Sequence, residues 1–142
     1  MSEGVVLLID YGMSQSEYFH PQRTDGTLKC FYRHKSNNNP FIQIGYQDIT
    51  ASVNFTDIYK SSIDSGFKVD GYSTQSMFLI SMGIESFLTD EENEKNKIKL
   101  AQEIKQLVMP GAMGEVFKVM ALTKKQSVKL DGFKEQNLTE RL

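Results

Sequence analysis

Polar residues that could do acid–base or binding chemistry gather in the first third of the chain. Both histidines, His20 and His34, lie there, with Asp10, Asp25 and Asp48 near them in the sequence. Imidazoles and carboxylates are common general acids and bases, and carboxylates also hold cationic groups. Their spacing matches no recognisable Ser-His-Asp arrangement, so the pattern indicates a polar site without defining a reaction.

Several other site chemistries are excluded or disfavoured. The stretch Gly111–Gly114 is too short and too late to be a glycine-rich nucleotide loop, and the single Cys30 leaves no zinc-binding spacing. Cys30 could be a nucleophile, but a lone cysteine beside an aromatic residue is more often a packing residue. With 24% charged residues and a net charge of −2, nothing indicates nucleic-acid or anionic membrane binding. One cysteine also excludes an internal disulfide and fits a reducing compartment.

The elements that must position the polar residues begin with Val5–Ile9. This run is apolar without alternation, which predicts a central strand of a parallel sheet covered on both faces. Asp10 and Tyr11 would then lie at its carboxyl edge, where ligands of open α/β sheets bind, and Gly12 would allow a turn. The alternative is a buried strand that ends in an Asx-type turn and binds nothing.

Residues 13–47 form a long stretch of weak periodicity. The turn signal Asp25-Gly26 is followed by a possible short strand, Thr27–Tyr32, and Asn37–Pro40 reads as a further loop. A connection of this length usually carries function or small elements of its own. A solvated excursion with ordinary polar residues remains the alternative.

Helices and strands alternate in the rest of the chain, which predicts an α/β fold. Thr56 is expected to cap a helix that runs to Ser65, with Gly66 in the left-handed position and a strand over Phe67–Tyr72. Thr74 caps a predicted helix, Gln75–Leu88, that is apolar nearly all round and therefore either buried or shared with a partner.

A further helix with an acidic start continues to Val108 and ends at Pro110-Gly111. Strands are predicted over Val116–Leu122 and, less clearly, Ser127–Leu130. The length of 142 residues suggests one domain, residues 1–133, followed by a polar tail, 134–142, that is expected to fray. No secretory signal is predicted, because Val5–Ile9 lacks a basic flank and a cleavage site.

A set of short segments along the chain has a recognisable order: Leu8–Gly12, Tyr18–Arg23, Asp25–Leu28, Tyr32–His34, Gln47–Thr50, Thr74–Gln75 with Phe78–Leu79, and Met113–Lys118. Together they resemble the carboxyl-terminal half of the MidA-like S-adenosylmethionine-dependent methyltransferases. Mitochondrial members of that family are protein arginine methyltransferases that support respiratory complex I assembly. The resemblance extends from about the first residue to Phe133.

The resemblance implies an α/β fold that is the carboxyl-terminal half of a class I (Rossmann-like) methyltransferase, with a loop insertion after the first strand. Val5–Ile9 would be the fifth strand of the seven-stranded sheet, and Phe67–Tyr72 and Val116–Leu122 the last two. The half that mainly binds the cofactor, S-adenosyl-L-methionine, has no counterpart in this sequence. Cofactor binding is therefore expected in the complete enzyme and weakly or not at all in this chain.

The resemblance also suggests roles for individual residues. In the complete enzyme a guanidinium nitrogen would attack the sulfonium methyl group in line, and carboxylates would hold the guanidinium through paired hydrogen bonds. The proposed catalytic residues are Asp10, Asp48 and Glu115, and the proposed substrate-binding residues are Tyr11, Tyr18, Arg23, Thr27, His34 and Thr50. Arg23 could instead anchor a substrate carboxylate or brace the loop, and each residue could equally make only a structural hydrogen bond. No metal site is expected.

Partners and location follow from the same resemblance. If the fifth strand normally pairs with the fourth, this chain has an open apolar sheet edge, which favours a homodimer or association with a separately encoded amino-terminal half. The expected substrate is a protein, with a respiratory complex I subunit as one candidate, and neither nucleic-acid binding nor membrane insertion is expected. The location would be the cytoplasm of a bacterium or the mitochondrial matrix of a eukaryote. The alternative function is a non-catalytic protein-binding module, or a fragment derived from such an enzyme.

Overall fold

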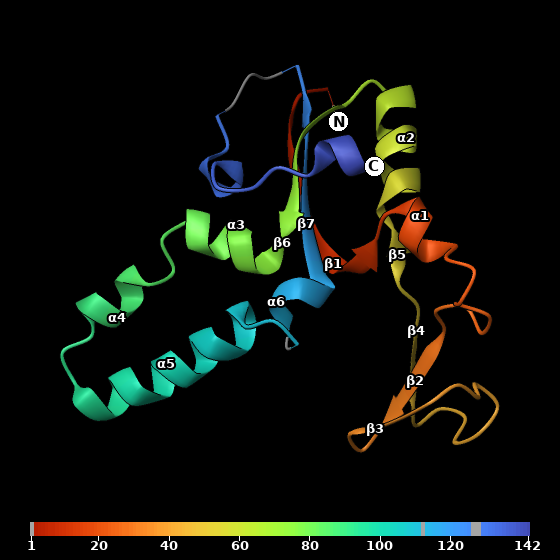
Figure 1. Cartoon of the computed structure of the whole chain (residues 1–142), viewed down its shortest axis with the longest axis horizontal. Coiled ribbons are helices and arrows are strands. Elements are labelled where there is room, and N and C mark those ends of the chain that lie inside the picture. The colour runs from red at the N-terminus through yellow and green to blue at the C-terminus, as the bar shows by residue number, and fades with distance from the viewer. Residues whose placement is uncertain (1, 112, 126–128) are drawn as a thin grey trace.

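A four-stranded sheet forms the centre of the molecule, in the order β5 (Val53–Asn54), β1 (Gly4–Met13), β7 (Phe117–Lys124) and β6 (Lys68–Thr74) (Figure 1). The computed structural model describes residues 2–111, 113–125 and 129–142. Strand β7 lies between β1 and β6 and is antiparallel to both. Strand β5 is parallel to β1 and pairs with it at Gly12 and Met13. The predicted α/β class is confirmed, with a mixed rather than a wholly parallel sheet.

The expectation that β1 is covered on both faces is wrong. Val6 and Leu8 pack into the core, whereas Val5, Leu7 and Ile9 are 41%, 45% and 52% exposed. The reason is that helix and tail residues cover one face of β1, and its other face is left open. Within the part of the chain that the structure describes, no strand pairs with the β5 side of β1 before Gly12.

Gly12 does not form the predicted turn but lies within β1. A Cβ added to it would lie 2.3 Å from the Val53 carbonyl oxygen and 2.8 Å from the Phe55 ring. Glycine is therefore needed here for the close approach of β5 and the following helix, not for its backbone freedom. The chain leaves the sheet only at Ser14, before the short helix α1 (Gln15–Tyr18).

The long stretch after β1 contains a small sheet of its own, in the order β3 (Lys35–Asn37), β2 (Lys29–Tyr32) and β4 (Asp48–Thr50). Figure 1 shows this sheet projecting away from the central one. Strand β2 confirms most of the predicted strand Thr27–Tyr32. Cys30 is fully buried in it, as expected for a packing residue.

Helix α2 (Phe55–Asp64) covers the core face of the sheet. Its N-cap is Asn54, whose side chain accepts a hydrogen bond from the Thr56 amide, so the predicted cap at Thr56 is displaced by two positions. At its other end Gly66 has a φ of 76°, as predicted, and the Phe67 amide bonds back to the Ser62 carbonyl. This is the helix end that a left-handed glycine followed by an apolar residue favours.

Strand β6 departs from simple alternation at a bulge between Val69 and Gly71. Phe67, Val69 and Tyr72 all join the cluster around Phe55, Met120 and Leu122, whereas Gly71 abuts Phe133 on the opposite face. The predicted grouping of Phe67, Val69 and Gly71 on one face is therefore wrong, because the extra residue of the bulge reverses the facing of those that follow.

The predicted single helix Gln75–Leu88 is two helices, α3 (Gln75–Ser81) and α4 (Ser86–Asp90). Thr74 caps α3 as expected by accepting from the Met77 amide, but Gly83, with a φ of 77°, ends the helical segment early. The next helix, α5 (Glu94–Val108), is capped by Asn93, and α6 (Met113–Val116) leads into β7. None of the helices in the described residues is long and apolar enough to cross a membrane.

The expectation that residues 134–142 fray is wrong, because they dock along the outer edge of β6. The Leu138 amide donates to the Tyr72 carbonyl at 2.6 Å, and the Asn137 and Gln136 side chains accept from the backbone of β6. A single turn of 3₁₀ helix, Asp131–Phe133, precedes this segment, and a second one, Thr139–Arg141, lies near its end. Of the return strand predicted over Ser127–Leu130, the first two residues lie outside the described residues, and Lys129 and Leu130 are not in a strand.

Candidate functional site

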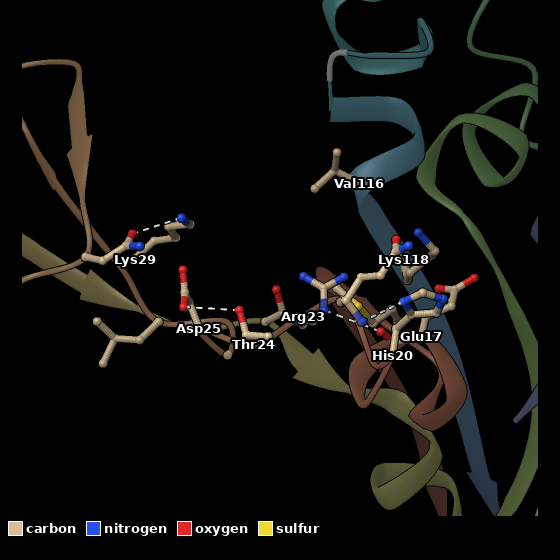
Figure 2. Close-up of a pocket in the computed structure, with 15 residues that line it drawn as sticks. Glu17, His20, Arg23, Thr24, Asp25, Lys29, Val116 and Lys118 are labelled. Atoms are coloured by element: carbon tan, nitrogen blue, oxygen red, sulfur yellow. Dashed lines mark hydrogen bonds between the residues drawn. The ribbon is translucent and has the colours of Figure 1, made fainter.

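An open cavity of about 710 Å³ lies beside the carboxyl end of β1. Its wall comes from the end of β1, from α1, from the loop that follows α1, and from the start of β7. Figure 2 shows the charged and polar side chains that gather there, and six of them carry the argument: Glu17, His20, Arg23, Asp25, Lys29 and Lys118.

Short-range hydrogen bonds hold the loop after α1 in place. The Arg23 amide donates to the His20 carbonyl at 2.8 Å, and its Nε donates to the Glu17 carbonyl at 3.4 Å. The His20 ring accepts from the Gln22 amide through Nδ1 at 3.3 Å. Gly26, with a φ of 67°, then turns the chain into β2. These contacts fix Arg23 against the end of α1.

Lys118 reaches the cavity from the base of β7, where it is half-buried and paired in register with Asp10. Burial lowers the pKa of the Lys118 amine, and the negative charges of Glu17 and Glu115 partly oppose that shift. Its Nζ donates to the Glu115 carbonyl oxygen. The charges of Glu17 and Glu115 therefore favour the protonated amine of Lys118, against the effect of burial.

The charged side chains that line the cavity form no ion pairs with one another in the described part of the chain. Across residues 2–111, 113–125 and 129–142, no ion pair within 4.0 Å involves Glu17, Arg23, Asp25, Lys29 or Lys118. Unpaired charges around an open volume can bind a charged ligand, whereas mutually paired ones would first have to separate. The described residues contain no group of three or more potential metal ligands.

Of the residues predicted to bind substrate, the structure places Arg23 in the cavity wall. Tyr18 and Thr27 flank the same loop and are joined by a hydrogen bond of 3.3 Å between their hydroxyls. Asp10 and Tyr11 directly precede the lining residue Gly12, and Asp10 accepts from the Tyr11 amide at 2.8 Å. Burial, followed by the charge of Asp10, raises the pKa of Tyr11.

Four other predicted residues lie outside the lining of this cavity. Asp48 and Thr50 are on β4, opposite Phe31 and Lys29 of the projecting sheet. His34 is in the tight turn between β2 and β3, with a φ of 62°. Glu115 is on α6, where its carbonyl oxygen rather than its carboxylate is the partner of Lys118. Their proposed roles stay predictions.

Sequence reasoning assigned no site role to Glu17, His20, Asp25, Lys29 or Lys118. His20 and Asp25 were noticed as members of a polar region, and the other three were not. Lys118 is 108 positions from Asp10 in the sequence and becomes its neighbour through the antiparallel pairing of β1 with β7. A correct prediction of the register between β1 and β7 would have identified Lys118 as a site residue.

A family model described as "Putative S-adenosyl-L-methionine-dependent methyltransferase" matches residues 1–73. A search among curated proteins found no match.

Two solved structures from Burkholderia thailandensis are similar to this chain. One, an "uncharacterized ACR, COG1565 superfamily protein", is 35% identical, with a TM-score of 0.95 over 99% of this chain and 38% of its own. The other, a "COG1565 superfamily member and likely methyl transferase" bound to S-adenosyl-homocysteine, is 35% identical, with a TM-score of 0.94 over 98% of this chain and 36% of its own. The chain thus spans less than two fifths of the length of either structure.

The family match extends over more than half of the 142 residues and includes β1, α1, the cavity loop and most of β6. The remaining residues superpose on the same relatives. This chain therefore belongs to the family of S-adenosyl-L-methionine-dependent methyltransferases that this model describes.

Proposed function

We propose that the chain is the carboxyl-terminal, substrate-facing part of a MidA-like methyltransferase that methylates arginine on a protein substrate. The observation that carries this proposal is the cavity of unpaired charged groups at the carboxyl end of β1. It lies in a chain that superposes, over 98% of its length, on part of a relative bound to S-adenosyl-homocysteine.

The central sheet supports assigning the chain to the carboxyl-terminal half of a class I methyltransferase. The resemblance implies that Val5–Ile9, Phe67–Tyr72 and Val116–Leu122 are the last three strands of one sheet. Strands β1, β6 and β7 cover most of these residues and belong to the same central sheet.

The residues of this chain do not by themselves fit the cofactor. A nucleoside is usually held in a largely enclosed, mostly apolar pocket with a few polar groups. The cavity beside β1 is instead open, and five of its fifteen lining residues carry a charge. We therefore assign cofactor binding to the complete enzyme and the orientation of the substrate to this chain.

Carboxylates at the cavity are suited to hold an arginine side chain. A carboxylate forms two parallel hydrogen bonds to a planar guanidinium, which fixes its orientation as well as its position. Glu17 and Asp25 line the cavity, and Asp10 lies at its edge on β1. These three are better placed for this role than Asp48, which lies on the projecting sheet.

The test is methyl transfer by a complete methyltransferase that contains this segment, assayed with a labelled methyl donor and an arginine-containing protein. Glu17→Gln and Asp10→Asn are each expected to lower kcat/KM by about tenfold or more, because a charge-assisted hydrogen bond contributes roughly 1.5–3 kcal/mol. Glu92→Gln, on the exposed connection before α5, is the matched control. Unchanged rates in both cavity variants would overturn the site assignment, and a loss in Asp48→Asn alone would move it to β4.

We also propose that the open edge of β1 pairs with a strand outside this chain. The tail covers the outer edge of β6, whereas the β5-side edge of β1 has no pairing strand from Gly4 to Tyr11 among the described residues. Unpaired edges with apolar neighbours tend to associate. Light scattering at high concentration is expected to show a dimer, or a complex when an amino-terminal half is supplied, and a monodisperse monomer in both cases would contradict this.

A non-catalytic protein-binding module is the second candidate function. The observation that favours it is the exposure of Phe41, Ile44 and Tyr46, at 81%, 74% and 78%, in the loop before β4. Exposed apolar residues gathered in one loop often mark a protein-binding surface. A complete protein that binds its partner but transfers no methyl group would favour this function.

A further inference from the structure

The Arg23 guanidinium is held at one end and free to bind at the other. Its Nε donates to the Glu17 carbonyl, which fixes the plane of the group against α1. Among the described residues no carboxylate lies within ion-pair distance of Arg23. Figure 2 shows the side chain in the middle of the cavity, between Asp25 on one side and Lys118 on the other. The two terminal nitrogens are the edge that pairs with planar oxyanions.

A second cation and two apolar side chains also line the cavity. Lys29 lines the cavity with its Nζ positioned by the Asn38 side-chain oxygen at 2.9 Å. Leu28 and Val116 also line it and are 39% and 52% exposed. An anionic group on a short aliphatic stem could place its charge at Arg23 and its methylene groups against the apolar side chains of the lining.

The charge balance distinguishes between a carboxylate and a phosphate. Three cationic and two carboxylate side chains line the cavity, so its net charge is one positive with His20 neutral. A phosphoryl group carries about −1.5 to −2 near neutral pH, and the two carboxylates would repel it. A carboxylate, with a single negative charge, matches the cavity better.

We propose that this cavity binds an acidic side chain of a polypeptide, with Arg23 as the anchor of its carboxylate. That this polypeptide is the methylated substrate rests on the proposed function. The substrate would then be a protein in which the target arginine lies near an aspartate or glutamate. In this arrangement Glu17 would bind the target arginine of the substrate, and Arg23 would bind the aspartate or glutamate near it.

Titration of ¹⁵N-labelled chain with short peptides, followed by nuclear magnetic resonance, tests the site without requiring methyl transfer. The probes are acetyl-Gly-Gly-Glu-Gly-Gly-amide, the same peptide with glutamine, and the same peptide with phosphoserine. The glutamate peptide is expected to bind at about millimolar Kd and to shift the Arg23 Nε–H signal and the Gly12 and Gly26 amides. The glutamine peptide is expected to cause no such shifts, and the phosphoserine peptide to bind more weakly than the glutamate peptide.

Arg23→Lys keeps the charge but loses the paired geometry, so it is expected to weaken glutamate-peptide binding by about tenfold. Arg33→Lys, at the β2–β3 turn and outside the cavity lining, is the matched control and is expected to bind like the unmodified chain. If Arg23→Lys does not fold, Lys29→Gln provides the comparison, with a smaller loss expected.

Equal binding of the glutamine peptide, tighter binding of the phosphoserine peptide, or full binding by Arg23→Lys would each overturn the inference. None of these outcomes concerns methyl transfer, so the proposed function could still hold. Conversely, the complete enzyme could transfer no methyl group while its carboxyl-terminal part binds the glutamate peptide as expected. That result would overturn the proposed function, and the inferred carboxylate site at Arg23 would still stand.

Discussion

Gln136 is the residue through which the tail most directly secures the central sheet. Its side-chain oxygen accepts from the Ser73 hydroxyl at 3.0 Å, from the Thr74 amide at 3.0 Å and from the Thr74 hydroxyl at 3.3 Å. Ser73 is fully buried and Thr74 is 6% exposed. We expect Gln136→Ala to destabilise the chain because it removes the acceptor of three donors on two buried residues.

The size of the effect follows from these contacts. A net hydrogen bond contributes about 1 kcal/mol, and a buried donor left without a partner costs roughly 1–3 kcal/mol. Gln136 itself is only half-buried, so water can enter the vacated space and satisfy part of the loss. We therefore expect the free energy of unfolding to fall by about 2 kcal/mol, and Tm to fall by roughly 5–8 °C for a domain of this size.

Urea denaturation followed by circular dichroism, with and without the substitution, measures this change. Gln106→Ala on the exposed face of α5 is the matched control and is expected to change stability little, because alanine is a good helix former. Gln136→Glu retains an acceptor oxygen and is expected to recover most of the stability at pH 7.

Two results would refute the reasoning. The first is a loss in Gln136→Ala within about 0.5 kcal/mol of the loss in Gln106→Ala, which would place it in the range of ordinary surface substitutions. The second is a Gln136→Glu variant as unstable as Gln136→Ala, which would mean that the acceptor oxygen is not the stabilising feature.

Three further predictions concern the bulge, pH and the cofactor. Gly71→Ala should lower the free energy of unfolding by about 1–3 kcal/mol in urea denaturation, because its Cβ would lie 2.3 Å from the buried Phe133 ring. Although burial alone would raise it, the pKa of Asp70 is lowered by hydrogen bonds from Lys68 and Thr123 and by the charge of Lys68. This depressed pKa stabilises the fold above the unfolded value of about 4, so stability should decline as pH falls below it, and Asp70→Asn should reduce that decline. Calorimetric titration of S-adenosylhomocysteine into this chain alone should show no detectable heat while circular dichroism shows a folded protein, and micromolar binding would contradict our assignment of the cofactor site.

Local features of the chain were predictable because they depend on neighbours in the sequence. Gly66 followed by Phe67 predicted the end of α2, and Thr74 predicted the start of α3, since caps and left-handed glycines act within one helical turn. The apolar run Val5–Ile9 predicted a strand, because strand formation there also depends on adjacent residues. The helix break at Gly83 was missed, although its signal, an isolated glycine in a helical pattern, was present in the sequence.

The candidate site was predictable only in outline. The sequence by itself indicated a polar region after β1 and named Arg23 within it, because loops at strand ends commonly carry polar sites. It could not separate His20 and Asp25, which line the cavity, from His34 and Asp48, which do not. That separation depends on the projecting sheet, whose pairing carries β4 and the β2–β3 turn away from the cavity lining.

Tertiary structure alone decided which faces and edges are covered. The sequence shows that Val5, Leu7 and Ile9 are apolar. Their exposure is a result of the tertiary structure, because no element of the described chain packs over the face of β1 that carries them. The polar tail docks because its amide groups satisfy the unpaired backbone of β6, and composition alone does not reveal such a fit. Lys118 enters the site through strand pairing over a long sequence separation. Long-range pairing and packing are set by the whole fold, whereas caps and strand-forming runs are set by a few adjacent residues.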